Sequence, residues 1–195
     1  MVPHSEYDNF SSRLGKRVSE IATDFAGDVF RFVDPKYSSA IDMFAGKGSL
    51  FSNGRWMAKG EVLTTYTSQK PETALAEALA ANRYYGFPDA RSTPMVLVTA
   101  HTKCETVINL CDGKVRQRLK LAAKTILHTD WRNENQLGHE SITQAWGRAF
   151  YENGVEAILI PSAASPNGTN LVAFPQNLAP DSILEVIHEV EWPRP

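Results

Sequence analysis

The chain has 195 residues, of which 43% are hydrophobic and 22% are charged. This length and composition are typical of one folded domain with its own core, which excludes a disordered or fibrous chain. The formal net charge of −2, from 20 basic and 22 acidic residues, provides no basic surface for nucleic-acid phosphates, so we expect no direct nucleic-acid binding.

The chain begins with a segment whose apolar residues have helical spacing. Between residues 5 and 25 they recur in steps of three or four, which predicts an amphipathic helix packed as an N-terminal extension. Residues 28–33 predict a short strand with Arg31 inside it. Residues 44–60 predict an irregular loop, and its glycines would let the backbone come close to a ligand.

The middle of the chain predicts two more strands and one helix. Residues 61–67 are rich in β-branched and aromatic side chains, which favours a strand. Pro71 suits the first turn of a helix, and we expect this helix to run to about residue 84. The continuous apolar run 95–100 is typical of a buried strand.

The last third predicts a helix and three strands. Apolar residues mark one face of a helix from residue 142 that stops at Asn153-Gly154. We expect strands at 157–160 and 170–174, with a loop at 162–168 between them, and a half-exposed strand at 184–192 in which Leu184, Val186, His188, Val190 and Trp192 share a face. The element order predicts a mixed α+β fold without regular βαβ units.

Glu77 is the most informative polar residue of the predicted 71–84 helix. It borders the apolar arc of that helix, and its neighbours at three and four residues are Thr73, Ala74, Ala80 and Ala81. No cation on the same helix is therefore placed to pair with it. The carboxylate either finds a partner elsewhere, waits for a ligand, or simply contacts water at the rim of the helix.

Two arginines are further candidates for binding an anion. Arg31 lies among apolar residues of its predicted strand, where a planar guanidinium suits a carboxylate or a diphosphate, although a structural ion pair explains it equally well. Arg55 lies in the predicted 44–60 loop and could reach the same ligand, but arginines are common in surface loops.

Other chemistries lack their sequence patterns. The five histidines have no metal-ligand spacing, and neither a P-loop nor a nucleophile elbow is present. Cys104 and Cys111 form no CxxC pair, so we expect both to be reduced and structural. No apolar stretch reaches the roughly 18 residues of a membrane span, and the N-terminus lacks a signal peptide, so we expect a cytoplasmic protein without membrane contact.

Taken in order, several motifs resemble the RES-domain family, which is named for its Arg, Glu and Ser. They are Phe30-Arg31, the NGRW of residues 53–56, Tyr66, the ALAEAL helix with Glu77, and the stretch from Gly154 to Pro175. Arg55, Tyr66 and Glu77 follow one another at intervals of eleven residues, similar to the family pattern. Met57 departs from it, since many members have Asn there.

The resemblance implies a fold and a set of site residues. The fold is similar to that of ADP-ribosyltransferases, with a mixed, largely antiparallel split sheet flanked by helices. Residues 1–27 would form a helical extension and residues 28–195 the NAD-binding catalytic domain. Arg31, Glu77 and Ser162 would be the catalytic triad, and Arg31, Arg55, Tyr66 and Ser162 would bind NAD⁺ as substrate, without a metal or other cofactor.

The resemblance also implies an activity and a partner. The first hypothesis is a toxin that cleaves the nicotinamide–ribose bond of NAD⁺ as a glycohydrolase or phosphorylase, which depletes cellular NAD and arrests growth. The alternatives are an ADP-ribosyltransferase that modifies a protein and a catalytically silent interaction module. A toxin implies a cognate protein antitoxin, typically with a DNA-binding helix-turn-helix. The sequence leaves a homo-oligomer open.

Overall fold

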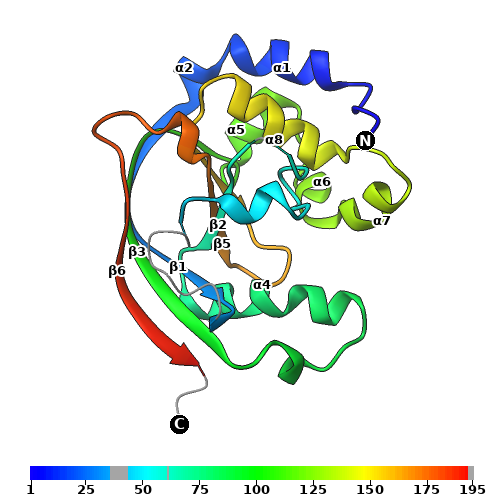
Figure 1. The fold of residues 1–195 in the computed structure, drawn as a ribbon. Coiled ribbons are helices and arrows are strands. Elements are labelled where there is room, and N and C mark those ends of the chain that lie inside the picture. Colours follow the sequence, from blue (N-terminus) through cyan, green and yellow to red (C-terminus); the bar gives the residue numbers. More distant parts are fainter. Residues whose placement is uncertain (36–43, 61, 193–195) are drawn as a thin grey trace.

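The computed structural model of the chain describes residues 1–35, 44–60 and 62–192 (Figure 1). Helices and strands follow one another without a repeated strand–helix–strand unit, so the predicted α+β class is confirmed. The elements are α1 (Tyr7–Gly15), α2 (Val18–Ile21), β1 (Ala22–Val33), η2 (Lys47–Leu50), β2 (Thr65–Ser68), α4 (Pro71–Tyr84), η3 (Asp89–Ser92), β3 (Met95–Asn109), α5 (Gly113–Leu119), α6 (Ala123–His128), α7 (Trp131–Gln136), α8 (Ile142–Glu152), β4 (Ala157–Pro161), β5 (Thr169–Ala173), η4 (Pro175–Asn177) and β6 (Ile183–Trp192).

The described strands form one connected sheet that closes on itself. The order is β1-β2-β5-β4-β3, β3 pairs again with β1, and β6 adds to the free side of β3. Only β3 and β4 run parallel, and the other described pairs are antiparallel. The largely antiparallel sheet is therefore confirmed. A split sheet is not, because the pairing continues around five strands.

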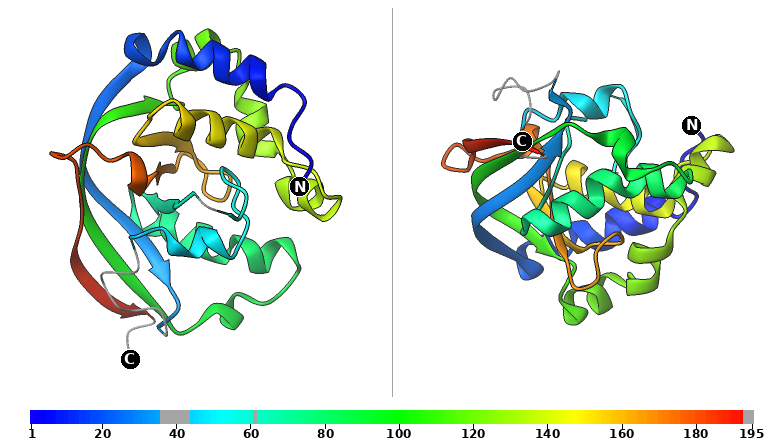
Figure 2. Two further views of the ribbon diagram at one scale, coloured as in Figure 1. Left: turned by 45° about the horizontal axis from the view of Figure 1, so that its top comes forward. Right: turned by 90° about the horizontal axis from the view of Figure 1, so that it is seen from below.

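The loop at residues 44–60 lies between two of the helices (Figure 1 and Figure 2). The long strands β1, β3 and β6 curve along one side of the molecule, and α1, α5, α6, α7 and α8 gather at one end (Figure 1). The loop, drawn in cyan, lies between α8 and α4 in both Figure 1 and the left view of Figure 2. It is irregular apart from η2, as predicted.

The predicted helix over residues 5–25 is wrong in its last part. The helices α1 and α2 end before Ala22, where β1 begins. From Ala22 opposite Ile108 onward, β1 pairs with β3 along its length. Backbone pairing in the sheet thus overrides the helical periodicity of this segment. The predicted division between residues 27 and 28 falls inside β1.

The first helix packs on the main core. Phe10 of α1 stacks on Trp146 of α8, with 4.7 Å between ring centroids. Leu14 is completely buried and belongs to the same hydrophobic cluster as Trp146 and Phe150. The apolar stripe read from the sequence therefore faces α8, and its burial stabilises the N-terminal segment on the fold.

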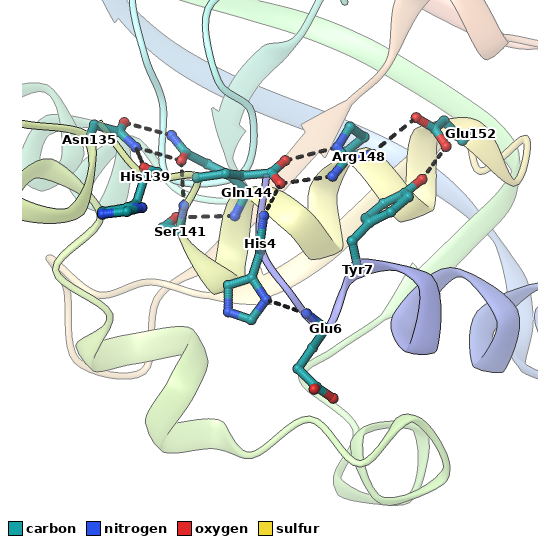
Figure 3. A network of polar contacts seen from close by, with 10 residues as sticks. His4, Glu6, Tyr7, Asn135, His139, Ser141, Gln144, Arg148 and Glu152 are labelled. Atoms are coloured by element: carbon teal, nitrogen blue, oxygen red, sulfur yellow. Dashed lines mark hydrogen bonds and ion pairs between the residues drawn. The ribbon is translucent and has the colours of Figure 1, made fainter. Parts of the chain in front are cut away.

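A polar network fixes the same segment to α8 (Figure 3). The buried carboxylate of Glu140 accepts two hydrogen bonds from Arg148, at 2.9 and 2.8 Å, and one from the backbone N–H of His4 at 2.9 Å. The guanidinium of Arg148 also lies over the ring of Tyr7, whose hydroxyl donates to Glu152. Burial alone would raise the pKa of Glu140, and the hydrogen bonds and charge of Arg148 lower it overall.

The two long predicted helices are confirmed. Pro71 is the first residue of α4, which ends at Tyr84 as expected. The helix α8 begins with a capping box, in which Ser141 and Gln144 exchange side-chain and backbone hydrogen bonds. It ends before Gly154, which has a φ of 74° and so takes a conformation that favours glycine.

The strands differ from prediction mainly in length. β3 continues nine residues past residue 100, to Asn109. β2 starts only at Thr65, because the N–H groups of Leu63 and Thr64 donate to side chains instead of to a strand, and Glu61 lies outside the described residues. In β6 the register shifts after Val186, so His188 is exposed and does not share the face of Leu184 and Val186 as predicted.

Two residues of α8 hold the 44–60 loop in place. A Cβ at Gly147 would lie 2.6 Å from the carbonyl carbon of Trp56 and closer still to its oxygen. Three residues earlier, Gln144 donates from Nε2 to the carbonyl oxygen of Gly54 at 2.9 Å. Gly147 and Gln144 of α8 therefore fix the backbone on both sides of Arg55, at Trp56 and at Gly54.

We predict that Gly147→Ala lowers the free energy of unfolding by about 2–3 kcal/mol or more, because the added methyl group meets backbone that cannot rotate away. Gly113→Ala is the control, since a Cβ there meets only the end of the Arg116 side chain at 3.6 Å. The control should change stability by less than about 1 kcal/mol. Urea denaturation measures both, and an unchanged Gly147→Ala protein would contradict the packing described.

Candidate active site

A cavity of about 650 Å³ lies between α4, the 44–60 loop and the ends of β2, β4 and β5. Its size is that of a small-molecule binding site. The lining residues include four of the five predicted site residues, namely Arg31, Arg55, Tyr66 and Glu77. The fifth, Ser162, is 7% exposed and lies between the lining residues Pro161 and Ala163. The fold thus brings together side chains from five separate segments.

The carboxylate of Glu77 accepts hydrogen bonds from two residues of other elements. Ser162 Oγ and Asn170 Nδ2 both donate to its Oε1 atom, each at 2.6 Å. As the sequence indicated, the partners of Glu77 come from other elements and not from its own helix. Within the described ranges neither an ion pair nor a donor to its second oxygen, Oε2, is found. The carboxylate is therefore oriented through Oε1, on a residue that lines the cavity.

Both partners of Glu77 are themselves held in place. The amide oxygen of Asn170 accepts a hydrogen bond from Ser68 Oγ at 2.7 Å, across the β2–β5 pair in which these residues are opposite. Ser162 Oγ accepts from the backbone N–H groups of Ala164 and Ser165, at 3.1 and 2.9 Å. The hydrogen bonds of this small network therefore all lead to Glu77, which favours a single geometry of its carboxylate.

Ser162 occupies its position because a strand ends there. The strand β4 ends at Pro161, and the backbone N–H of Ser162 donates to the carbonyl of Gly168 at 2.8 Å, which closes the loop 162–168. A Cβ at Gly168 would lie 2.7 Å from atoms of Thr73 in the first turn of α4. Glycine at 168 thus lets the loop approach α4 closely enough for Ser162 to reach Glu77.

Tyr66 fixes one wall of the cavity. Its hydroxyl accepts the backbone N–H of Trp56 at 3.1 Å, and a Cβ at Gly54 would collide with the phenol ring. Burial raises the pKa of Tyr66 well above its usual value, so the hydroxyl is neutral at physiological pH. The ring supports the loop and also presents an aromatic surface to the cavity.

The two arginines contribute positive charge to the cavity. Arg55 donates from Nη1 to the backbone carbonyls of Ile126 and Thr129, at 3.2 and 2.9 Å. Burial lowers the pKa of Arg55, and the negative charge of Glu77 partly opposes this shift. Burial also lowers the pKa of Arg31, which lies on β1 with Tyr66 as an electrostatic neighbour. Half-buried guanidinium groups of this kind suit an anionic ligand.

The sequence analysis missed Asn170 and Ser68. Asn170 is only the first residue of the predicted strand 170–174, and Ser68 only follows the predicted strand 61–67. What they share is position, since each is a polar residue near the end of a strand that reaches the cavity. That position becomes informative only when the pairing of β2 with β5 is known.

The thiols lie outside this arrangement. Cys104 and Cys111 are both free, and only Cys104 is buried. Burial raises the pKa of Cys104 to about 12, which keeps it a neutral thiol. In the described part of the chain no cluster of His, Cys, Asp or Glu side chains could hold a metal ion. No helix there is long and apolar enough to cross a membrane.

The chain is similar to a known protein family and to a solved structure. A family model described as the RES domain matches residues 28–194. Curated proteins give no significant match. Among solved structures, a chain of the crystal structure of the M. tuberculosis MbcT-MbcA toxin-antitoxin complex is similar over 93% of both chains, with a TM-score of 0.71 and 18% sequence identity. At this identity the likeness establishes the fold.

We predict that Asn170→Asp lowers the free energy of unfolding by on the order of 2 kcal/mol at pH 7, because it replaces a donor to Glu77 with a second carboxylate. Repulsion raises the folded-state pKa of the pair above its unfolded value, so the lost stability should return as the pH falls to about 4, the usual pKa of an unperturbed Asp or Glu. Urea denaturation at both pH values measures this, with the exposed Asn167→Asp as control. A deficit independent of pH would contradict the arrangement.

Proposed function

Since the chain belongs to the RES domain family, we propose that it is a toxin that cleaves NAD⁺ between nicotinamide and ribose. The observation that carries the proposal is the carboxylate of Glu77, oriented by Ser162 and Asn170 at the wall of a cavity of about 650 Å³. A negative charge held in one orientation suits a reaction that builds positive charge on its substrate.

Cleavage of NAD⁺ builds such a charge. The bond between the ribose C1′ and the nicotinamide nitrogen breaks, its electron pair leaves with nicotinamide, and the ribose becomes oxocarbenium-like. Glu77 stabilises this charge through Oε2 or grips a ribose hydroxyl with it. Attack by water then gives ADP-ribose and a proton, whereas phosphate gives ADP-ribose phosphate. Transfer to a protein side chain is the alternative outcome.

The other site residues bind and position the substrate. The guanidinium groups of Arg31 and Arg55 suit the diphosphate of NAD⁺. Tyr66 offers a flat aromatic surface to the nicotinamide ring. Ser162 acts as a positioning residue, because its hydroxyl is already donated to Glu77 at 2.6 Å.

A partner protein follows from the same proposal. An enzyme that consumes NAD⁺ must be restrained in its own cell, and the chain with a similar fold comes from a toxin-antitoxin complex. We therefore propose a cognate antitoxin, with any DNA contact made by its helix-turn-helix, and a cytoplasmic site of action. A silent interaction module is the weaker reading, since such a module has no need for an oriented carboxylate inside a cationic cavity.

We predict that Glu77→Gln lowers the rate of nicotinamide release from NAD⁺ by on the order of 10² or more. The amide oxygen of Gln can still accept from Ser162 and Asn170, so the variant keeps its fold and loses only the charge. Release is followed by chromatography, with and without phosphate, which also identifies the acceptor. Glu72→Gln, on the exposed first turn of the same helix, is the matched control and should keep the wild-type rate.

Nicotinamide release by folded Glu77→Gln at the wild-type rate would remove the carboxylate from the mechanism. No release by the wild-type protein under any condition would favour the interaction module.

We predict that expression of the wild-type chain without its partner depletes NAD⁺ and arrests growth, while Glu77→Gln is tolerated. NAD⁺ is measured in cell extracts over time after induction. Arrested cells with a normal NAD⁺ content would instead point to ADP-ribosylation of a protein target.

A further inference from the structure

The same cavity also carries an aromatic cluster remote from the Ser162–Glu77 contact. We call Tyr84, Trp131 and Arg132 the aromatic rim. All three line the cavity, Tyr84 from the end of α4 and the other two from the start of α7. The guanidinium of Arg132 lies 4.3 Å from the ring centroid of Trp131 and 5.0 Å from that of Tyr84. Tyr84 is 43% exposed, which is high for an aromatic residue.

Hydrogen bonds join the two elements that carry the rim. The hydroxyl of Tyr84 donates to the carboxylate of Asp130, with distances of 3.0 and 3.2 Å to its two oxygens. Asp130 also caps α7 by accepting the backbone N–H of Asn133 at 3.2 Å. The end of α4 and the start of α7 are therefore held together at the rim, where Tyr84 is exposed and Trp131 is partly exposed.

The rim lies at a distance from Glu77 that suits a dinucleotide. Glu77 and Tyr84 are seven residues apart on α4, which places them on one face about 10.5 Å apart along the helix axis. Arg55 lies within electrostatic reach of both ends, since its pKa is affected by Glu77 and also by Arg132 and Asp130. The cavity thus has a carboxylate region, a central cation and an aromatic region.

We propose that the aromatic rim binds the adenosine half of the dinucleotide. The purine stacks on Trp131 or Tyr84, and Arg132 contacts a phosphate, which are the contacts that aromatic faces and guanidinium groups make with nucleotides. The identification of the ligand rests on the proposed function, because Glu77 then marks the nicotinamide ribose. The rim would make the enzyme prefer NAD⁺ to nicotinamide mononucleotide, which lacks the adenosine half.

The direct test is calorimetric titration with ADP-ribose, which contains the adenosine half and no nicotinamide. Trp131→Ala should weaken its binding roughly tenfold or more, the usual effect of losing one stacking surface. Trp131→Phe retains an aromatic face and should restore most of the affinity. Phe87→Ala is the matched control, because Phe87 is an exposed aromatic near Tyr85 and Arg91 but does not line the cavity.

Kinetics provide a second readout of the same proposal. The ratio of kcat/KM for NAD⁺ to that for nicotinamide mononucleotide should fall roughly tenfold in Trp131→Ala, mainly through a higher KM for NAD⁺. Phe87→Ala should keep the wild-type ratio.

The proposal and the function on which it rests can fail separately. Wild-type protein that binds ADP-ribose through Trp131 but releases no nicotinamide would refute the proposed reaction and keep the nucleotide site. No binding of ADP-ribose by the wild-type protein, equal affinity in folded Trp131→Ala, or an equal loss in Phe87→Ala would overturn the aromatic rim as that site.

Discussion

The arrangement of the cavity depends on one interaction, the pair of hydrogen bonds that Ser162 and Asn170 donate to the same oxygen of Glu77. This contact joins α4 to the loop after β4 and to the start of β5. It needs Gly168 for the close approach of the loop and Ser68 to orient the amide of Asn170. A carboxylate held in this way needs no reorganisation when positive charge develops beside it, which is the condition for electrostatic catalysis.

The 44–60 loop, which forms another wall of the cavity, is also held by specific contacts. Gly147 allows α8 to touch the backbone of Trp56, and Gln144 binds the carbonyl of Gly54. Arg55, between these points, is tied to the carbonyls that precede α7. The loop of residues 44–60 has little regular structure, yet its conformation near the cavity is fixed by contacts with α8 and with the segment that precedes α7. The helices at this end of the molecule therefore determine the position of loop residues that line the cavity.

The structure brings several residues that the sequence singled out into one cavity. Arg31, Tyr66 and Glu77 were identified from residue type, spacing and family resemblance, and the structure places all three in one cavity. The helix α4 agrees with its prediction, because Pro71 marks its start and strong helix formers follow. Only the first residues of β1, from Ala22 to Phe25, were predicted as helix, because their pairing with β3 is a long-range contact that leaves no local signal. Asn170 was missed for the same reason, since its role depends on strand register. Met57, the departure from the family pattern, is buried in the core.

The most direct test of the central claim is a crystal structure of the Glu77→Gln variant with intact NAD⁺. The account predicts that the nicotinamide ribose lies within hydrogen-bond distance of residue 77, and that the Ser162 and Asn170 contacts to that side chain are preserved. The diphosphate should lie toward Arg31 and Arg55. NAD⁺ bound with its nicotinamide ribose away from residue 77, or bound outside this cavity, would contradict the account.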